Sequence, residues 1–420
     1  MGSVFFLYSL KYYLSLAIVL SFSQQETGVG YKEQSRRKGI LSWILGLIGS
    51  GLSEPEALRA GGPVGLTPNL EHVKLERYPK VSVHIPLYNE KNVVGRLLTA
   101  VSSFDYKGPY EVIIADDSTD ETTEILKGFL KEQYGGLRVI KGDEGIEIFS
   151  SPVIPPDKPS LTVIHRTSRS GFKGGALREA LRVTDPKAEF ISVFDADFVP
   201  YPDTLELFLK YFKVQNSMRE DYSKSKVAAV QGYQWHVLNK SENWITRGVR
   251  SEYAGSYVIE RSGAEIYSGI KQISGSVYMI RRDVLEEIGW ETSITEDFQL
   301  TLKLYEKGYK VVYTPYIQAP AECVSTLKRL IRQRMRWAEG HSNNIKRMFT
   351  RLLLNPKLTP TEKLEFLYLS PYYLQSFFFL IGTISWLISE TLFPARLPFW
   401  TSIWGWSLVL TNFLCLPLMN

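Results

Sequence analysis

Short apolar runs alternate with helix-like segments through the middle of the chain. The runs are rich in Val, Ile and Phe and lie at residues 81–88, 111–117, 137–141, 161–166, 190–197 and 227–233. Between them, helical spacing of apolar residues recurs over 92–102, 122–134, 174–182 and 203–213. Near-continuous apolar strands joined by helices predict an α/β domain with a mostly parallel sheet that is covered on both faces. Residues 142–160 carry four prolines and are predicted to form a surface loop.

Long apolar stretches at the chain ends predict membrane segments. Residues 366–388 and 397–419 are each free of charge, and at about 1.5 Å rise per residue each can cross a hydrocarbon core of roughly 30 Å. The first 22 residues are apolar apart from Lys11 and predict an uncleaved anchor, which the basic residues 31–38 would hold on the cytoplasmic side. Residues 40–52 are too short to span and are expected at the membrane interface.

These patterns divide the chain into five parts. We expect an N-terminal membrane anchor and interfacial segment at 1–53, a linker at 54–80, a catalytic α/β domain at 81–324, amphipathic interfacial helices at 325–365 and two transmembrane helices at 366–420. The protein would then be a multi-pass integral membrane protein whose catalytic domain lies in the cytoplasm.

Composition excludes several classes of protein. The 420 residues include only two cysteines, which excludes a disulfide scaffold and a Cys-rich zinc module. The net charge of +5 is too small for a duplex-DNA binder, so no nucleic-acid partner is expected.

Polar residues cluster where three of the predicted strands end, at 88–90, 116–117 and 195–197. Ligands of open α/β sheets bind beyond these carboxyl ends. Asp195 and Asp197 are two residues apart, so their carboxylates can share one face and hold Mg²⁺ or Mn²⁺ together with diphosphate oxygens. The alternative is that one of these acids caps the following helix.

Asp116 and Asp117 close another strand, and their carboxylates can accept hydrogen bonds from a nucleobase or ribose. Helix capping by the neighbouring Ser118 or Asp120 is the competing role. Lys173 lies in the glycine-rich segment 170–175 that opens a helix, where it can meet a phosphate group. That segment matches neither the P-loop nor the dinucleotide pattern, and a plain flexible loop would have the same composition.

Two further segments complete the candidate chemistry. Asp297 lies between a strand-like run at 276–281 and a helix at 298–307, and it can serve as a general base unless it only caps that helix. Residues 325–349 form a basic amphipathic helix that can lie on an anionic bilayer. Within it Trp337 can stack on a sugar ring, and Arg336 can neutralise a diphosphate.

Taken in order, these segments resemble the family-two inverting glycosyltransferases, in the branch of the cellulose-synthase-like and glucomannan or β-glucan synthases. The matching segments are Pro86–Glu90, Asp116–Asp120, Gly171–Leu177, Asp195–Asp197, Thr295–Asp297 and Gln333–Trp337, the last with the pattern Gln-x-x-Arg-Trp. Each is ambiguous alone, but six in the family's order form a specific signal over residues 81–349.

The resemblance implies a GT-A fold, a UDP- or GDP-sugar donor, Mg²⁺ or Mn²⁺, and a β-linked product from an α-linked donor. It implies that Asp195 and Asp197 hold the metal and that Asp297 is the base. The residues that it places at the nucleotide-sugar are Tyr88, Glu90, Asp116, Asp117, Lys173 and Asp195. Those that it places at the acceptor and the diphosphate are Glu296, Gln333, Arg336 and Trp337.

Two departures from the family bear on the product. Processive synthases of this branch have more membrane helices after the Gln-x-x-Arg-Trp helix, and the cellulose-synthase pattern Phe-x-Val-Thr-x-Lys is absent. Either the chain is truncated after Asn420 or it builds no polymer channel by itself. The leading hypothesis is sugar transfer to a growing polysaccharide. The alternatives are non-processive transfer to a lipid or glycolipid, and a non-catalytic nucleotide-sugar-binding subunit of a synthase complex. The chain itself is expected to act in a homo-oligomer or in such a complex.

Overall fold

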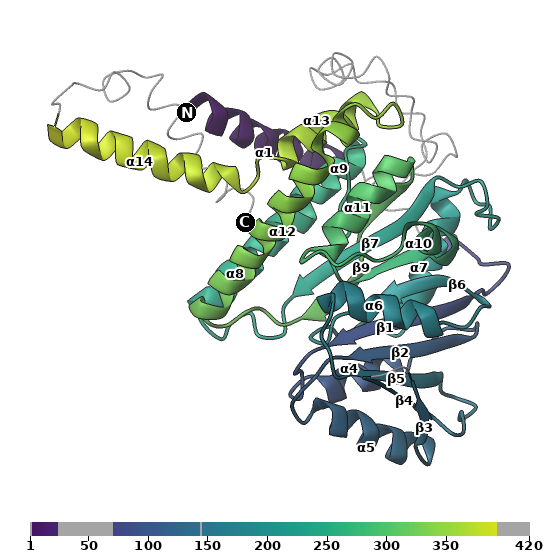
Figure 1. Cartoon of the computed structure of the whole chain (residues 1–420). Helices are drawn as coiled ribbons and strands as arrows, with labels where there is room; N and C mark the ends of the chain where they lie inside the picture. The colour runs from purple at the N-terminus through teal and green to yellow at the C-terminus, as the bar shows by residue number, and fades with distance from the viewer. Residues whose placement is uncertain (1, 24–69, 143–144, 393–420) are drawn as a thin grey trace.

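The computed structural model of the protein describes residues 2–23, 70–142 and 145–392 (Figure 1). Within these residues a nine-stranded sheet has the strand order β3-β4-β5-β2-β1-β6-β8-β7-β9. The strands are β1 (Lys80–Leu87), β2 (Tyr110–Asp116), β3 (Arg138–Lys141), β4 (Ile146–Ser150), β5 (Ser160–Arg166), β6 (Ala188–Val193), β7 (Val227–His236), β8 (Tyr278–Arg281) and β9 (Lys310–Ala321). Each of the six apolar runs of the sequence overlaps one of them.

The sheet is mixed rather than mostly parallel. β5, β2, β1 and β6 lie side by side and parallel, and β7 is parallel to β9. β8 lies antiparallel between β6 and β7, while β3 and β4 form an antiparallel edge beside β5. The prediction of a mostly parallel sheet therefore holds for the four central strands and for the pair β7 and β9, but not for β3, β4 and β8.

Two strands were not expected from the sequence. β4 lies inside the segment predicted as a surface loop. The four prolines of that segment all follow the strand, in the loop 151–159 between β4 and β5. β9 contains Pro315 and Pro320, which argue against a central strand, but it is the edge strand of the sheet, where proline is tolerated.

Helices cover both faces of the sheet. α4 (Val94–Val101), α5 (Thr122–Tyr134) and α7 (Thr204–Gln215) pack on one face. α6 (Phe172–Val183), α10 (Arg282–Ile288), α11 (Glu296–Lys307) and the C-terminal part of α12 (Leu327–Leu353) pack on the other. In β1, Val81, Val83 and Ile85 belong to the first core, whereas His84 contacts Thr184 at the end of α6. This alternation buries the strand on both sides and leaves its carboxyl end open for a site.

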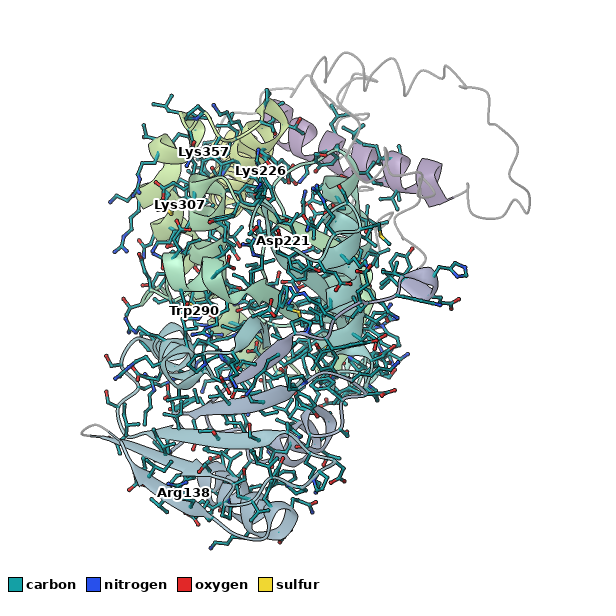
Figure 2. The ribbon with its side chains drawn as sticks, turned by 90° about the vertical axis from the view of Figure 1, so that its right-hand side faces the viewer. Arg138, Asp221, Lys226, Trp290, Lys307 and Lys357 are labelled. Atoms are coloured by element: carbon teal, nitrogen blue, oxygen red, sulfur yellow. The ribbon has the colours of Figure 1, made fainter. Side chains whose placement is uncertain are left out.

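A second group of helices lies at the β7–β9 end of the sheet. It contains α8 (Trp244–Ala254), the π-helical segment η2 (Gly255–Arg261), α9 (Ser262–Ile266) and α13 (Pro360–Leu369). Figure 2 shows Arg138 on the edge strand β3 at one end of the molecule, and Lys307 and Lys357 at the other. A short 3-10 turn, η1 (Leu70–His72), precedes β1.

The N-terminal segment forms helix α1 (Gly2–Ser23), which contacts α9 and η2. Lys11, the charge in this otherwise apolar run, forms an ion pair of 2.7 Å with Glu365 and lies 3.6 Å from the ring centroid of Tyr368. The helix is therefore tied to α13 by a polar contact.

The predicted membrane span at 366–388 is divided into two helices. α13 ends at Leu369 and α14 (Leu374–Leu392) begins after Pro371, which interrupts the backbone hydrogen-bonding of a helix. Among the described helices, none has both the length and the apolar character that crossing a bilayer requires. The second predicted span, at 397–419, and the segments predicted over 24–69 lie outside the described residues.

Candidate active site

A cavity of about 970 Å³ opens where the parallel strands of the sheet centre end. Its size falls within the range of small-molecule sites in proteins. Its wall contains every residue predicted for the site except Asp116, namely Tyr88, Glu90, Asp117, Lys173, Asp195, Asp197, Glu296, Asp297, Gln333, Arg336 and Trp337. The fold thus brings segments from β1 to α12 around one space.

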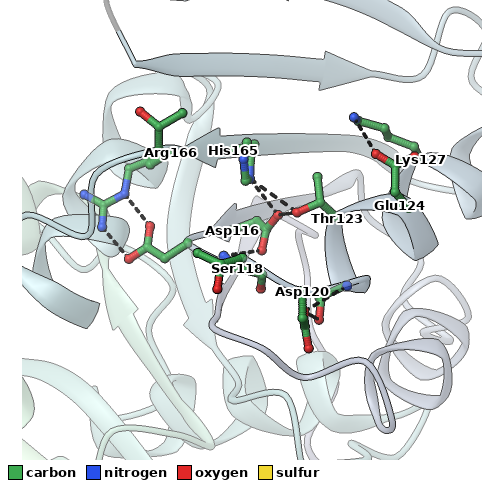
Figure 3. A network of polar contacts seen from close by, with 12 residues as sticks. Asp116, Ser118, Asp120, Thr123, Glu124, Lys127, His165 and Arg166 are labelled. Carbon is green, nitrogen blue, oxygen red and sulfur yellow. Dashed lines mark hydrogen bonds and ion pairs between the residues drawn. The ribbon is translucent and has the colours of Figure 1, made fainter.

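Asp116 is fully buried behind this wall. One carboxylate oxygen accepts the Ser118 N–H at 3.0 Å, and the other accepts the Thr123 hydroxyl at 2.6 Å and lies 3.0 Å from Nδ1 of His165 (Figure 3). Burial opposes ionisation, but the hydrogen bonds outweigh it and lower the pKa of Asp116. The predicted contact of Asp116 with a nucleotide does not fit this position. The residue organises the turn between β2 and α5.

Asp117 lines the cavity, but both of its oxygens have an internal partner. Nε and Nη2 of Arg166 each donate to it at 2.6 Å (Figure 3). Arg166 also donates to the carbonyls of Ser170 and Phe172, at 3.1 and 3.3 Å. Burial raises the pKa of Asp117, and the guanidinium group opposes that rise. This bidentate pair joins the end of β2 to the loop before α6.

Two arginines between the end of β5 and the start of α6 were not predicted from the sequence. Arg166 ends β5, and Arg169 places its guanidinium carbon 3.4 Å from the ring centroid of Tyr88 and 5.8 Å from that of Phe172. Both rings are partly exposed. The signal that could have revealed these arginines is their position directly before the glycine-rich segment.

Lys173 lies among carboxylates rather than facing solvent. Its Nζ is 2.6 Å from Asp195 Oδ1 and 3.5 Å from Glu296 Oε1, and it donates to the carbonyl of Gly275 at 2.9 Å. Burial lowers the pKa of Lys173, but the charges of Asp195 and Glu296 outweigh it, so the pKa is raised. The lysine therefore carries a positive charge at the centre of the cavity wall.

The remaining acids of the strand ends carry more negative charge than one lysine can balance. Burial, followed by the charges of Asp195 and Glu90, raises the pKa of Asp197 to about 7. Burial and then Asp195 raise the pKa of Glu90 to about 7. Such crowding favours a bound cation. Within the described residues, no three His, Cys, Asp or Glu side chains are arranged to enclose an ion.

Asp297 stands at the start of α11, on the same wall as Lys173. Its Oδ1 accepts the Phe298 N–H at 2.7 Å. Burial raises the pKa of Asp297, and the nearby Lys173 opposes that rise. Facing it, Gly275 has a φ of +76°, and a methyl group there would lie 3.3 Å from Asp297 Oδ2 and 3.1 Å from Lys173 Nζ. Glycine at this position therefore keeps space open between Asp297 and the lysine.

α12 supplies the opposite side of the cavity. Gln333, Arg336 and Trp337 line it, and Oε1 of Gln333 is buried without a hydrogen-bond partner in the described structure. The guanidinium carbon of Arg334 lies 4.6 Å from the Trp337 ring centroid, and Arg334 pairs with Glu252 at 2.5 Å. Arg334 therefore lies over one face of the tryptophan ring.

Comparison with known proteins identifies the family. Residues 190–419, more than half of the chain, match the description Glycosyl transferase family group 2. The chain belongs to this family. Residues 82–146 also match Glycosyl transferase family 2, so the resemblance seen in the sequence motifs is confirmed.

Curated relatives of this family 2 glycosyltransferase fall in the predicted branch. It is 27% identical over 326 residues to the probable glucomannan 4-beta-mannosyltransferase 3 of Oryza sativa subsp. japonica, which covers 77% of this chain and 52% of the relative. It is 29% identical over 266 residues to the beta-monoglucosyldiacylglycerol synthase of Synechocystis sp., which covers 63% of this chain and 48% of the relative. The chain thus spans about half the length of the curated relatives it matches.

A solved structure supports the fold. The mannosyltransferase of Pyrobaculum calidifontis, in complex with GDP-Man and Mn²⁺, aligns with a TM-score of 0.52 at 19% identity over 89% of this chain and 90% of that chain. The family 2 glycosyltransferase described here therefore has the GT-A fold, with a mixed sheet.

Proposed function

We propose that the protein is a membrane-associated inverting glycosyltransferase that moves a sugar from a UDP- or GDP-sugar to a growing polysaccharide. One observation carries this proposal: a half-buried carboxylate, Asp297, shares a cavity with Lys173 and the acidic pair Asp195 and Asp197. A base, a cation and a candidate metal-binding pair around one space are the parts that transfer from a nucleotide-sugar requires.

The donor would lie at the strand ends. Tyr88, Glu90 and Asp117 border the space expected for the nucleoside, and Lys173 lies where a diphosphate can reach it. Asp195 and Asp197 would hold Mg²⁺ or Mn²⁺, and the uncompensated acids there suit a hard cation bound by one or two carboxylates plus phosphate oxygens. When bound, such an ion supplies positive charge against the leaving diphosphate.

The transfer step follows from the position of Asp297. Its carboxylate takes the proton of an acceptor hydroxyl, and the acceptor oxygen bonds to the anomeric carbon as the bond from that carbon to the diphosphate oxygen breaks. A single in-line displacement inverts the anomeric carbon. The electron pair of the broken bond leaves with the nucleoside diphosphate, towards the side where Lys173 lies.

The acceptor would lie between α11 and α12. Glu296 and Gln333 offer oxygen atoms to sugar hydroxyls, and Trp337 offers a ring face for stacking. Arg336 adds a positive charge on the same side.

A lipid acceptor is the second candidate. A relative is named for synthesis of a glucosyldiacylglycerol, and α14 exposes a row of large apolar side chains. In this case the product would be a glycolipid with a single added sugar, and it would partition into organic solvent.

The deciding experiment uses the Asp297→Asn variant of the full chain in membranes. The wild-type protein is incubated with UDP- and GDP-sugars and Mn²⁺, and the product is sized and partitioned. We expect transfer by the wild type and a loss of roughly 10²-fold or more in Asp297→Asn, because proton abstraction contributes about that much. Binding of UDP or GDP should survive in the variant.

Full activity in Asp297→Asn would refute the base assignment. Nucleotide binding without turnover by the wild type, on any of these donors, would favour the non-catalytic subunit instead.

A further inference from the structure

Helix α12 contacts the start of α11 through three residues that the proposed reaction does not use. Gly340, His341 and Asn344 lie on the inward face of α12, where Asn344 is 2% exposed and His341 9%. Their partners are Ser293 and Thr295, which precede the acidic pair at 296–297, and Phe298, which follows it.

Asn344 binds the loop before α11 on two residues. Its Nδ2 lies 3.0 Å from Oγ1 and 3.2 Å from the carbonyl oxygen of Thr295, and 3.1 Å from Oγ of Ser293. Its Oδ1 lies 3.3 Å from the same serine oxygen. The Ser293 oxygen also accepts the Thr295 N–H at 3.3 Å. A buried amide with this many partners fixes a loop whose backbone would otherwise be free to shift.

Gly340 and His341 complete the contact on both sides of the acidic pair. A methyl group at Gly340 would lie 2.6 Å from the Thr295 side chain, so the two segments approach as closely as glycine permits. The His341 ring stacks on Phe298 with a centroid distance of 4.4 Å and an interplanar angle of 17°. α12 therefore holds Thr295 before, and Phe298 after, the pair Glu296 and Asp297.

The same helix carries Gln333, Arg336 and Trp337 about one to three turns earlier. We infer that Gly340, His341 and Asn344 are positioning residues that fix Asp297 relative to the acceptor side of the cavity. This inference rests on the proposed function, because it assigns the contact a role in transfer. A base must lie within hydrogen-bonding reach of the acceptor hydroxyl, and an error of about 1 Å can cost roughly 10²-fold in rate.

The test compares neighbouring asparagines of the full chain. Asn344→Ala removes the buried amide, whereas Asn343→Ala changes an exposed residue of the same helix. Thr295→Val removes one acceptor oxygen and keeps the side-chain shape against Gly340. We expect Asn344→Ala and Thr295→Val to lower kcat about tenfold or more, with the KM of the sugar donor changed by less than about twofold. Asn343→Ala should match the wild type.

Hydrogen exchange supplies a readout that needs no turnover. Amides of residues 293–298 should exchange faster in Asn344→Ala, and not in Asn343→Ala. Wild-type kcat and unchanged exchange in Asn344→Ala would overturn the inference. If Asn344→Ala fails to fold, a wild-type kcat in Thr295→Val overturns it equally. Absence of transfer by the wild type contradicts the proposed function instead, and the exchange result still decides whether the contact fixes the loop.

Discussion

The two acidic pairs at the strand ends differ in what surrounds each carboxylate. Asp116 and Asp117 have every oxygen engaged by protein donors. Asp195 pairs with Lys173, and burial together with the charge of Asp195 raises the pKa of Asp197. The first pair is therefore built into the scaffold, and the second has capacity left for a ligand. In the sequence both pairs are two acidic residues at the end of an apolar strand. The roles of the two pairs differ because different residues surround them in the folded structure, which the residue types do not reveal.

The pair of His165 and Asp116 predicts a pH-dependent stability. The hydrogen bond to Asp116 raises the pKa of His165. Its stabilising contribution is therefore fully present below about pH 6.5, the value for an unperturbed histidine, and it is lost as the pH rises through the raised pKa. We expect His165→Gln to lower the thermal unfolding midpoint more at about pH 5.5 than at about pH 8.5.

The control for this measurement is His72→Gln, which changes an exposed histidine of η1. His72→Gln should change the thermal unfolding midpoint by the same small amount at both pH values. An equal loss of midpoint by His165→Gln at both pH values would show that the charge on His165 does not matter.

At the scale of single elements, local pattern predicted most helices and strands of the catalytic domain. α5 begins and ends where its apolar spacing does, and β1 and β2 differ from prediction by one residue at each end. The errors come from proline. Four prolines led to the prediction of a loop where β4 lies, and two prolines lie within β9, which was not predicted. Pro371 lies inside the apolar run that was predicted as one membrane span. The antiparallel position of β8 between β6 and β7 depends on tertiary packing, which the local sequence pattern does not predict.

α8 and α12 are linked by one capping residue. The Asn243 side chain accepts the N–H groups of Ile245 and Thr246 at 2.8 and 3.0 Å, and it donates to the carbonyl of Ser325 just before α12. We expect Asn243→Ala to lower the free energy of unfolding by about 1 kcal/mol or somewhat more, because it removes a helix cap together with a tether. Thermal or urea unfolding measures this loss.

Asn243→Asp is the matched variant. It keeps the cap acceptor and favours the positive end of α8, but it loses the donor to Ser325. Its loss should be smaller than that of alanine. If aspartate and alanine destabilise equally, the bond to Ser325 and not the cap accounts for the effect.

At the scale of the whole molecule, the sequence motifs predicted which segments meet but not how they are held. Eleven residues from six motifs line one cavity: those of the first five motifs lie at strand ends or at the start of a helix, and those of the sixth lie in about the first three turns of α12. The residues that hold these segments in place belong to no acidic or aromatic cluster in the sequence; they are Arg166, Arg169, Gly275 and Asn344. Their roles depend on distances between segments far apart in the chain, so only the folded structure reveals them.

The exposed residues on the outer face of α12 indicate a surface that can contact a bilayer. Leu327, Ile331 and Met335 follow each other at four-residue spacing and are 50%, 49% and 66% exposed, in a helix rich in Lys and Arg. Apolar side chains beside basic ones on an exposed helix suit an anionic membrane surface. We propose that this face lies in the interface when the full chain is bound to vesicles.

An environment-sensitive dye on Met335→Cys measures this contact, and Val153→Cys is the matched control because Val153 is also 66% exposed but lies in the loop after β4. Cys415 is replaced by serine in both, since the other native cysteine, Cys323, is buried. We expect the emission of the dye at position 335 to shift to the blue in vesicles containing phosphatidylserine, and the shift to shrink at high salt because basic side chains contribute to binding. The dye at position 153 should not respond. Equal spectra at both positions would place the outer face of α12 in water and leave membrane attachment to other parts of the chain.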